Sequence, residues 1–271
     1  MPIELPAGVS VSLFVACVSV AIVVIGIAKA GFGGGIGILA VPLTIAVLPP
    51  TDGLGVMLPL LIAGDVFSYV HHRKNRSALH LRWLVAGGVV GIVLATAALW
   101  SIPWAAERWH WGDASPAINR TLMLVVGVAC LVMVAAQVYR MTGLPLPRIP
   151  GTPGAGRGVG AFAGFVSTLA HSAGPVVNVY LLEQRLTKSL QVGTSVLFFL
   201  IVNLAKVPSY VGLGYITGRT LLVSLMFLPL IPVGTMLGYW MHTRVSERWF
   251  TAIMYAGAAA AAGHMIWKAV A

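Results

Sequence analysis

The sequence has few charged residues and very few acidic ones. Only 9% of its 271 residues are charged, against about 25% in a typical soluble domain, and seven are Asp or Glu. This scarcity excludes an ordinary water-soluble fold. Since 58% of the residues are hydrophobic, we expect an all-α polytopic membrane protein with one membrane domain.

Cysteine is also scarce. The two cysteines, Cys17 and Cys130, lie inside apolar runs, which excludes a disulfide framework and leaves no metal-ligand spacing. The net charge of +10 does not predict a nucleic-acid partner, because the Lys and Arg residues lie in short loops between apolar runs. We therefore expect no metal, no cofactor and no nucleic acid, and a lipid bilayer around the protein.

Apolar segments, by contrast, fill the chain. We identify ten of them, at residues 9–29, 38–48, 54–71, 81–101, 118–140, 156–170, 175–183, 190–212, 218–241 and 249–268. Two of these, 38–48 and 175–183, are too short to cross about 30 Å of hydrocarbon at about 1.5 Å per residue. Because each follows a break, we interpret them as half-helices, which gives 8–10 membrane segments.

The chain contains an internal repeat. A shift of 138 residues places GFGGGIGILAVPL (31–43) over LAHSAGPVVNVYL (169–181), Gly55 over Gly193 and Asp65 over Asn203. Each half then consists of a broken helical hairpin followed by three transmembrane helices. We assign the first repeat to residues 1–143 and the second to 159–271, and we expect the Pro/Gly-rich linker at 144–158 to be irregular or extended.

The charge distribution predicts the orientation. The loop HHRKNR (71–76) is strongly basic, and basic loops favour the cytoplasmic side. With that loop inside, eleven of the 17 Lys and Arg residues lie on the cytoplasmic side and four on the outer side. Both termini are then periplasmic. The two halves are inverted and pseudo-symmetric, an arrangement typical of secondary transporters.

The first break combines glycines with a lysine. Lys29 precedes a turn that includes Gly33, Gly34 and Gly35. Such glycines expose backbone N–H groups, and a charge at membrane depth is costly unless it is paired, so we expect these four residues to bind an anion. Two alternatives stay open: Lys29 could reach the far interface, and the glycines could allow close helix packing.

The second break is more polar. Pro175 suits the first turn of a new helix after His171, Ser172 and Gly174, so free N–H groups would face the same cavity. We expect His171, Ser172, Gly174 and Asn178 to contact the anion, and His171 is also a candidate proton carrier. The alternative for His171 is an interhelical hydrogen bond.

Polar residues recur in the helices that follow the breaks. Lys206 lies three residues after Asn203, on the same helix face, and we expect both to contact the substrate. Asp65, the equivalent of Asn203 in the repeat, either pairs with Lys29 or Lys206 to neutralise a buried charge or carries a coupling proton. The sequence leaves these possibilities open.

These stretches resemble a known family. GIAKAGFGGGIGILAVPL (26–43) is similar to the first signature of the TauE/SafE sulfite-exporter family, and GFVSTLAHSAGPVVNVYLL (164–182) and VGTSVLFFLIVNLAKVPSYVGLG (192–214) resemble the second-half pattern of one branch of it. The resemblance implies a carrier of sulfite, organosulfonate or a related anion in the bacterial inner membrane. Many members carry a second glycine-rich motif where this chain has His171 to Pro175, so the second half of the site differs.

The residues and the resemblance together predict a secondary transporter for a small sulfur-containing anion, with export as the expected direction and protons as the simplest coupling ion. An anion channel and a non-transporting membrane scaffold are the alternatives. An enzyme is not expected, because the chain has no HExxH motif, no paired carboxylates and no Ser/His/Asp set with a plausible shared site.

Overall fold

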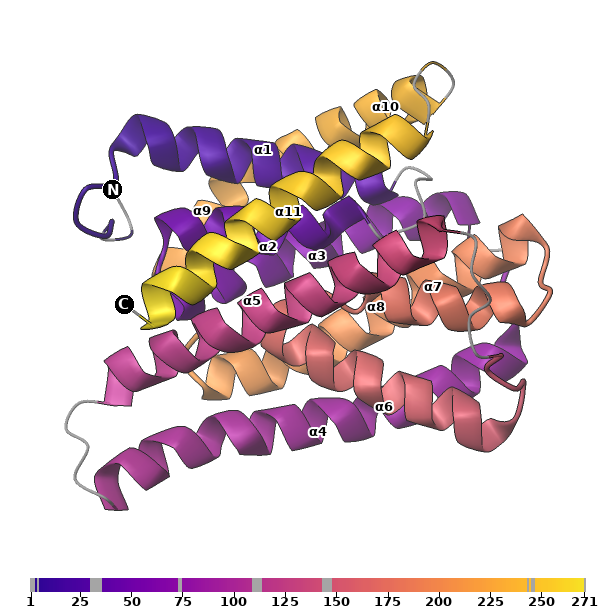
Figure 1. The fold of residues 1–271 in the computed structure, drawn as a ribbon, viewed down its shortest axis with the longest axis horizontal. Coiled ribbons are helices and arrows are strands. Elements are labelled where there is room, and N and C mark those ends of the chain that lie inside the picture. Colours follow the sequence, from indigo (N-terminus) through magenta and orange to yellow (C-terminus); the bar gives the residue numbers. More distant parts are fainter. Residues whose placement is uncertain are drawn as a thin grey trace.

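The computed structural model describes residues 3, 5–29, 36–72, 75–108, 114–142, 148–242, 244 and 247–270. In this part of the chain all regular structure is helical (Figure 1), which confirms the all-α membrane fold. The first half comprises α1 (Val11–Lys29), the short 3-10 helix η1 (Ile36–Leu39), α2 (Ala40–Val47), α3 (Pro50–His72), α4 (Ala78–Arg108) and α5 (Ala114–Met141). The second half comprises α6 (Pro153–Ala170), α7 (Gly174–Glu183), α8 (Lys188–Gly212), α9 (Gly218–Phe227), α10 (Leu230–His242) and α11 (Glu247–Val270).

The helices follow the predicted segments. Both half-helices are short, with eight residues in α2 and ten in α7, so neither can cross about 30 Å of hydrocarbon. Among the described helices, α1, α3, α4, α5 and α8 are long and apolar enough to do so, and the α9–α10 pair makes a sixth if it counts as one span. The chain is therefore a multi-pass membrane protein.

Two predictions about chain breaks were wrong. The linker predicted to be irregular at 144–158 has no regular structure over 148–152 but is helical from Pro153 onward, and 144–147 lie outside the described residues. Proline is tolerated at the first helical position, and the Thr152 side chain accepts a hydrogen bond from the Ala155 N–H. The segment predicted as one helix at 218–241 is two helices that bend by 42°. Pro229 lies at the bend and lacks the N–H that would continue the helix.

Helix contacts follow the internal repeat. The most extensive contacts join α4 with α6, α1 with α10, α5 with α11 and α3 with α8. A shift of 138 residues carries α1 onto α6 and α4 onto the α9–α10 pair. The α1–α10 contact is therefore the equivalent of the α4–α6 contact, whereas the α5–α11 and α3–α8 contacts each join two equivalent helices. In Figure 1 the α1–α10 and α4–α6 contacts lie on opposite sides of the molecule. The inversion of the halves across a bilayer stays a prediction.

Glycines allow the closest helix approaches. In the α4–α6 contact, a Cβ atom on Gly91 or Gly160 would meet the backbone of the partner helix, and a Cβ on Gly26 would lie 2.7 Å from Gly234 of α10. Small residues at such positions let membrane helices pack closely. Gly26 therefore serves helix packing, whereas the predicted anion-binding glycines Gly33, Gly34 and Gly35 lie outside the described residues.

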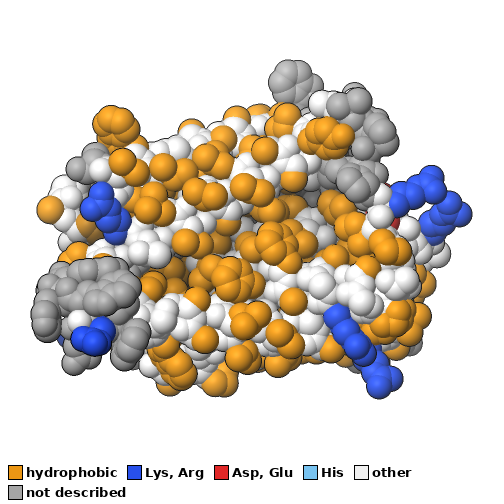
Figure 2. Space-filling view, turned by 60° about the horizontal axis from the view of Figure 1, so that its bottom comes forward, with side chains coloured by type: hydrophobic (Ala, Val, Ile, Leu, Met, Phe, Trp, Pro, Cys, Tyr) orange, Lys and Arg blue, Asp and Glu red, His pale blue; other side chains and the backbone are white. Residues whose placement is uncertain are grey.

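The surface and the helix ends suit a bilayer around the bundle. Figure 2 shows apolar side chains across the middle of one face, with Lys and Arg toward its two ends. In Figure 1 both chain termini lie at one end of the bundle, whereas α5 and α10 finish at the opposite end, where α6 and α11 begin. An apolar band between two polar ends is what a membrane protein presents to lipid.

Candidate functional site

The second broken hairpin, formed by α6 and α7, provides one wall of the site. His171 ends α6 in the left-handed conformation, with φ 50° and ψ 21°, and its N–H donates to Ser167 O at 3.0 Å. That conformation costs a side-chain-bearing residue about 1–2 kcal/mol. Pro175 follows in the first turn of α7, and no side chain among the described residues caps this helix start. Backbone N–H groups of the break are thus available to a ligand.

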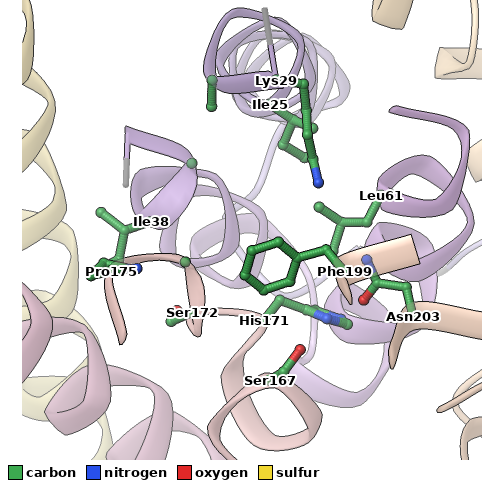
Figure 3. A pocket seen from close by; sticks show the side chains of 13 residues that line it. Ile25, Lys29, Ile38, Leu61, Ser167, His171, Ser172, Pro175, Phe199 and Asn203 are labelled. Carbon is green, nitrogen blue, oxygen red and sulfur yellow. The ribbon is translucent and has the colours of Figure 1, made fainter. Parts of the chain in front are cut away.

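A cavity lies where this break meets the end of α1, the start of η1, and helices α3 and α8 (Figure 3). Its volume is about 60 Å³, and one water needs about 10–15 Å³ on the same scale. Several waters or one small anion would therefore fill it. Its lining consists of Ile25, Ala28, Lys29, Gly37, Ile38, Leu61, Ser167, His171, Ser172, Gly174, Pro175, Phe199 and Asn203.

Lys29, the last residue of α1, points into the cavity in Figure 3. Its ammonium forms an ion pair with Asp65 Oδ1 and lies 5.4 Å from the centre of the Phe199 ring. The other carboxylate oxygen, Asp65 Oδ2, accepts a hydrogen bond of 2.6 Å from Asn203 Nδ2, and these two residues are 138 positions apart. Of the two partners that the sequence allowed for Asp65, the structure thus shows Lys29, together with the repeat equivalent Asn203.

Lys206 is a fully buried lysine. Its Nζ donates to Ser167 O at 3.1 Å and to Ser167 Oγ at 2.9 Å, and it lies 3.0 Å from His171 Nδ1. His171 Nε2 lies 3.2 Å from Leu54 O. Because a carbonyl only accepts, Nε2 carries the ring proton and Nδ1 accepts from Lys206. Lys206 therefore has neutral partners, and no carboxylate in the described part of the chain lies within ion-pair distance of it.

The two lysines occupy exchanged positions of the repeat. Lys29 and Ser167 are equivalent under the shift of 138 residues, and so are Ser68 and Lys206. In each half a side chain on the third helix of that half donates to a carbonyl of the broken hairpin: Ser68 Oγ to Lys29 O at 3.2 Å, and Lys206 Nζ to Ser167 O at 3.1 Å. The same hydrogen bond thus occurs in both halves. In the first half the lysine, Lys29, accepts through its backbone carbonyl, whereas in the second half the lysine, Lys206, donates through its side chain.

The predicted site residues fall into two layers. Those that line the cavity are Lys29, His171, Ser172, Gly174 and Asn203. Asp65 and Lys206 lie behind this layer, fully buried and bonded to its members. Asn178 does not line this cavity, and its Oδ1 accepts a hydrogen bond of 3.1 Å from Ser195 Oγ.

Among the lining residues that the sequence did not propose as site residues are Ser167 and Phe199. The repeat could have found Ser167, because it is the equivalent of Lys29. Phe199, whose ring lies between Lys29 and His171 in the view of Figure 3, gave no signal, because it is one of many apolar residues in α8. It lines the cavity beside the Lys29 ammonium.

The site holds more basic than acidic side chains. Lys29 and Lys206 are two lysines, Asp65 is one carboxylate, and His171 donates from one ring nitrogen only, as a neutral ring does. Burying a charge without a counter-charge costs several kcal/mol. An anion in the cavity would compensate this excess.

Half-helices that meet at a buried cavity beside two lysines, inside a multi-pass helical bundle, are typical of one class, the membrane transporters. A comparison with protein-family models makes the class specific. The model described as sulfite exporter TauE/SafE matches residues 18–265, and the chain belongs to this family. It is therefore a membrane transporter of the sulfite-exporter type, and the resemblance of its signature stretches is confirmed. Searches of the curated proteins and of the solved structures gave no match.

Proposed function

We propose that this protein is a secondary transporter that exports a small sulfur-containing oxyanion across the bacterial cytoplasmic membrane, with the anion held between the two broken hairpins. The observation that supports this most is the excess of basic over acidic side chains at the buried cavity, with Lys29 and Lys206 against Asp65. Family membership supports the sulfur-oxyanion class.

The donors at the cavity suit such an anion. Sulfite and sulfonates present three acceptor oxygens, and the site offers the Lys29 ammonium on one side and backbone N–H groups at the start of α7 on the other. Lys206 adds positive charge from behind His171. A cavity of about 60 Å³, with room for several waters, can hold a small sulfur oxyanion.

Counterflow in proteoliposomes tests this function. Vesicles loaded with unlabelled sulfite should take up radiolabelled sulfite faster than empty vesicles, and uptake should saturate. Lys206→Met should lose most of this uptake, because it removes the buried charge that faces the cavity from behind. Lys188→Met, at the exposed start of the same helix, is the matched control and should retain it.

Three results would contradict the proposal. Saturable uptake that is absent for sulfite, methanesulfonate and taurine alike would exclude a transporter of sulfur anions. Uptake without saturation and without stimulation by internal sulfite would indicate a channel. Equal uptake by Lys206→Met and Lys188→Met, both well folded by size-exclusion chromatography, would exclude the buried charge as the basis of anion binding.

A further inference from the structure

The Lys29 ammonium contacts the Asp65 carboxylate and also lines the cavity in which an anion would bind. Its side chain is 14% exposed and lines the cavity, whereas its partner Asp65 is fully buried and does not line it. An anion that enters the cavity therefore meets the same ammonium that neutralises Asp65. One ammonium stabilises each of two neighbouring anionic groups less than it would stabilise one of them alone, because the two groups repel each other. The anion and the Asp65 carboxylate therefore compete for the Lys29 ammonium.

Asp65 has few other charged neighbours. Lys206 of α8 attracts it from a longer distance, and Asn203, also of α8, donates to Oδ2. The half-helix α2 contains no titratable residue, and the nearby charge on α9, Arg219, acts on Asp52 near the other end of α3. If Lys29 turns to the anion, Asp65 Oδ1 keeps no donor among the described residues. A buried carboxylate in that position favours its protonated form.

We propose that Asp65 binds the proton of the transport cycle. The anion takes the Lys29 ammonium away from Asp65, and a proton from solution forms an O–H bond at Asp65 Oδ1 in its place, so that anion and proton are bound together. This inference rests on the proposed function. Because the charges of one proton and one monovalent anion cancel, the loaded site keeps the net charge of the empty site. Anion and proton then leave together, so the outward gradient of the anion, and not the proton gradient, drives export.

His171 is the less suitable of the two groups that the sequence offered as proton carriers. Its Nε2 already carries a proton toward Leu54 O, so a second proton would have to bind Nδ1. That nitrogen lies 3.0 Å from the ammonium of Lys206, which has no carboxylate partner in the described chain. Two cations in contact repel each other. Lys206 and the neutral His171 ring thus keep each other as partners, whereas the Lys29–Asp65 pair can exchange one partner for another.

The dependence of anion affinity on pH tests the proposal. Methanesulfonate, which stays a monoanion throughout, is titrated calorimetrically into purified protein at several pH values and in buffers of different ionisation enthalpy. If one proton binds with each anion, the dissociation constant rises about tenfold per pH unit wherever Asp65 is ionised in the anion-free protein. Asp65→Asn should bind the anion with no such slope, and Asp52→Asn, a carboxylate on the same helix outside the cavity, should keep it.

Sulfite is titrated in the same way. Because sulfite itself takes up a proton, the pH slope and proton uptake of Asp65→Asn are subtracted from those of the native protein. If the native protein binds sulfite or methanesulfonate with a dissociation constant that does not change with pH, and takes up no proton, the proposed function stands but the inference is wrong. Equal slopes in the native protein and Asp65→Asn overturn it as well. If Asp65→Asn does not fold, the proton uptake of the native protein with methanesulfonate decides alone. The absence of binding by both anions instead overturns the proposed function.

Discussion

At the scale of single residues, the ion pair of Lys29 and Asp65 controls the stability of the site. Lys29→Met leaves a buried carboxylate to which, among the described residues, only the Asn203 amide donates a hydrogen bond. Breaking a buried ion pair from one side costs about 3–5 kcal/mol, and we expect a loss of that order in the free energy of unfolding. The double variant Lys29→Met/Asp65→Asn removes both charges and should recover most of the loss, as measured by denaturant unfolding in detergent. A double variant no more stable than Lys29→Met would show that the two charges are not coupled.

At the scale of helices, the contact between α4 and α6 depends on glycine, and two glycines of α6 form a matched pair. A Cβ at Gly160 would meet the backbone of Leu84, so Gly160→Ala should lower the free energy of unfolding by about 1–3 kcal/mol. A Cβ at Gly158, two residues earlier, meets open space, so Gly158→Ala should raise it by about 0.5–1 kcal/mol through helix propensity. Thermal unfolding of both variants measures the difference, and shifts of the same sign would contradict the packing role of Gly160.

The helices also show what could be predicted from the sequence. The half-helix α7 was predictable, because Pro175 removes a donor and the apolar run after it is short. The helical start at Pro153 was missed, because a Pro/Gly-rich composition indicates a loop while the Thr152 cap depends on one local hydrogen bond. Within the site, the repeat identified Asn203 as the equivalent of Asp65 but did not predict that they are hydrogen-bonded. The choice of Lys29 over Lys206 as the partner of Asp65 likewise depends on tertiary packing that no spacing encodes.

At the scale of the whole molecule, the inverted orientation of the two halves is the prediction that most needs a test. Ile3, Asp52 and Gly218 line one cavity at one end of the bundle. The loop of Asn75 and the start of α8 should lie at the opposite end, which the excess of Lys and Arg assigns to the cytoplasm. Gly218 is the repeat equivalent of His80, which follows Asn75 closely. Equivalent positions should therefore face opposite sides of the membrane.

Single cysteines in a background without Cys17 and Cys130 provide the measurement. A membrane-impermeant maleimide should label Ala7→Cys and Gly218→Cys in intact spheroplasts, but Asn75→Cys and Ser189→Cys only after the membrane is disrupted, since all four positions are exposed in the structure. A complete reversal of this pattern would place the termini in the cytoplasm but keep the halves inverted. Labelling of Gly218→Cys together with Asn75→Cys would show that the two halves face the same way. A two-fold axis in the membrane plane could then not relate the two breaks at the cavity. The exchanged positions of Lys29 and Lys206 in the repeat would have to be explained without an inversion of the halves.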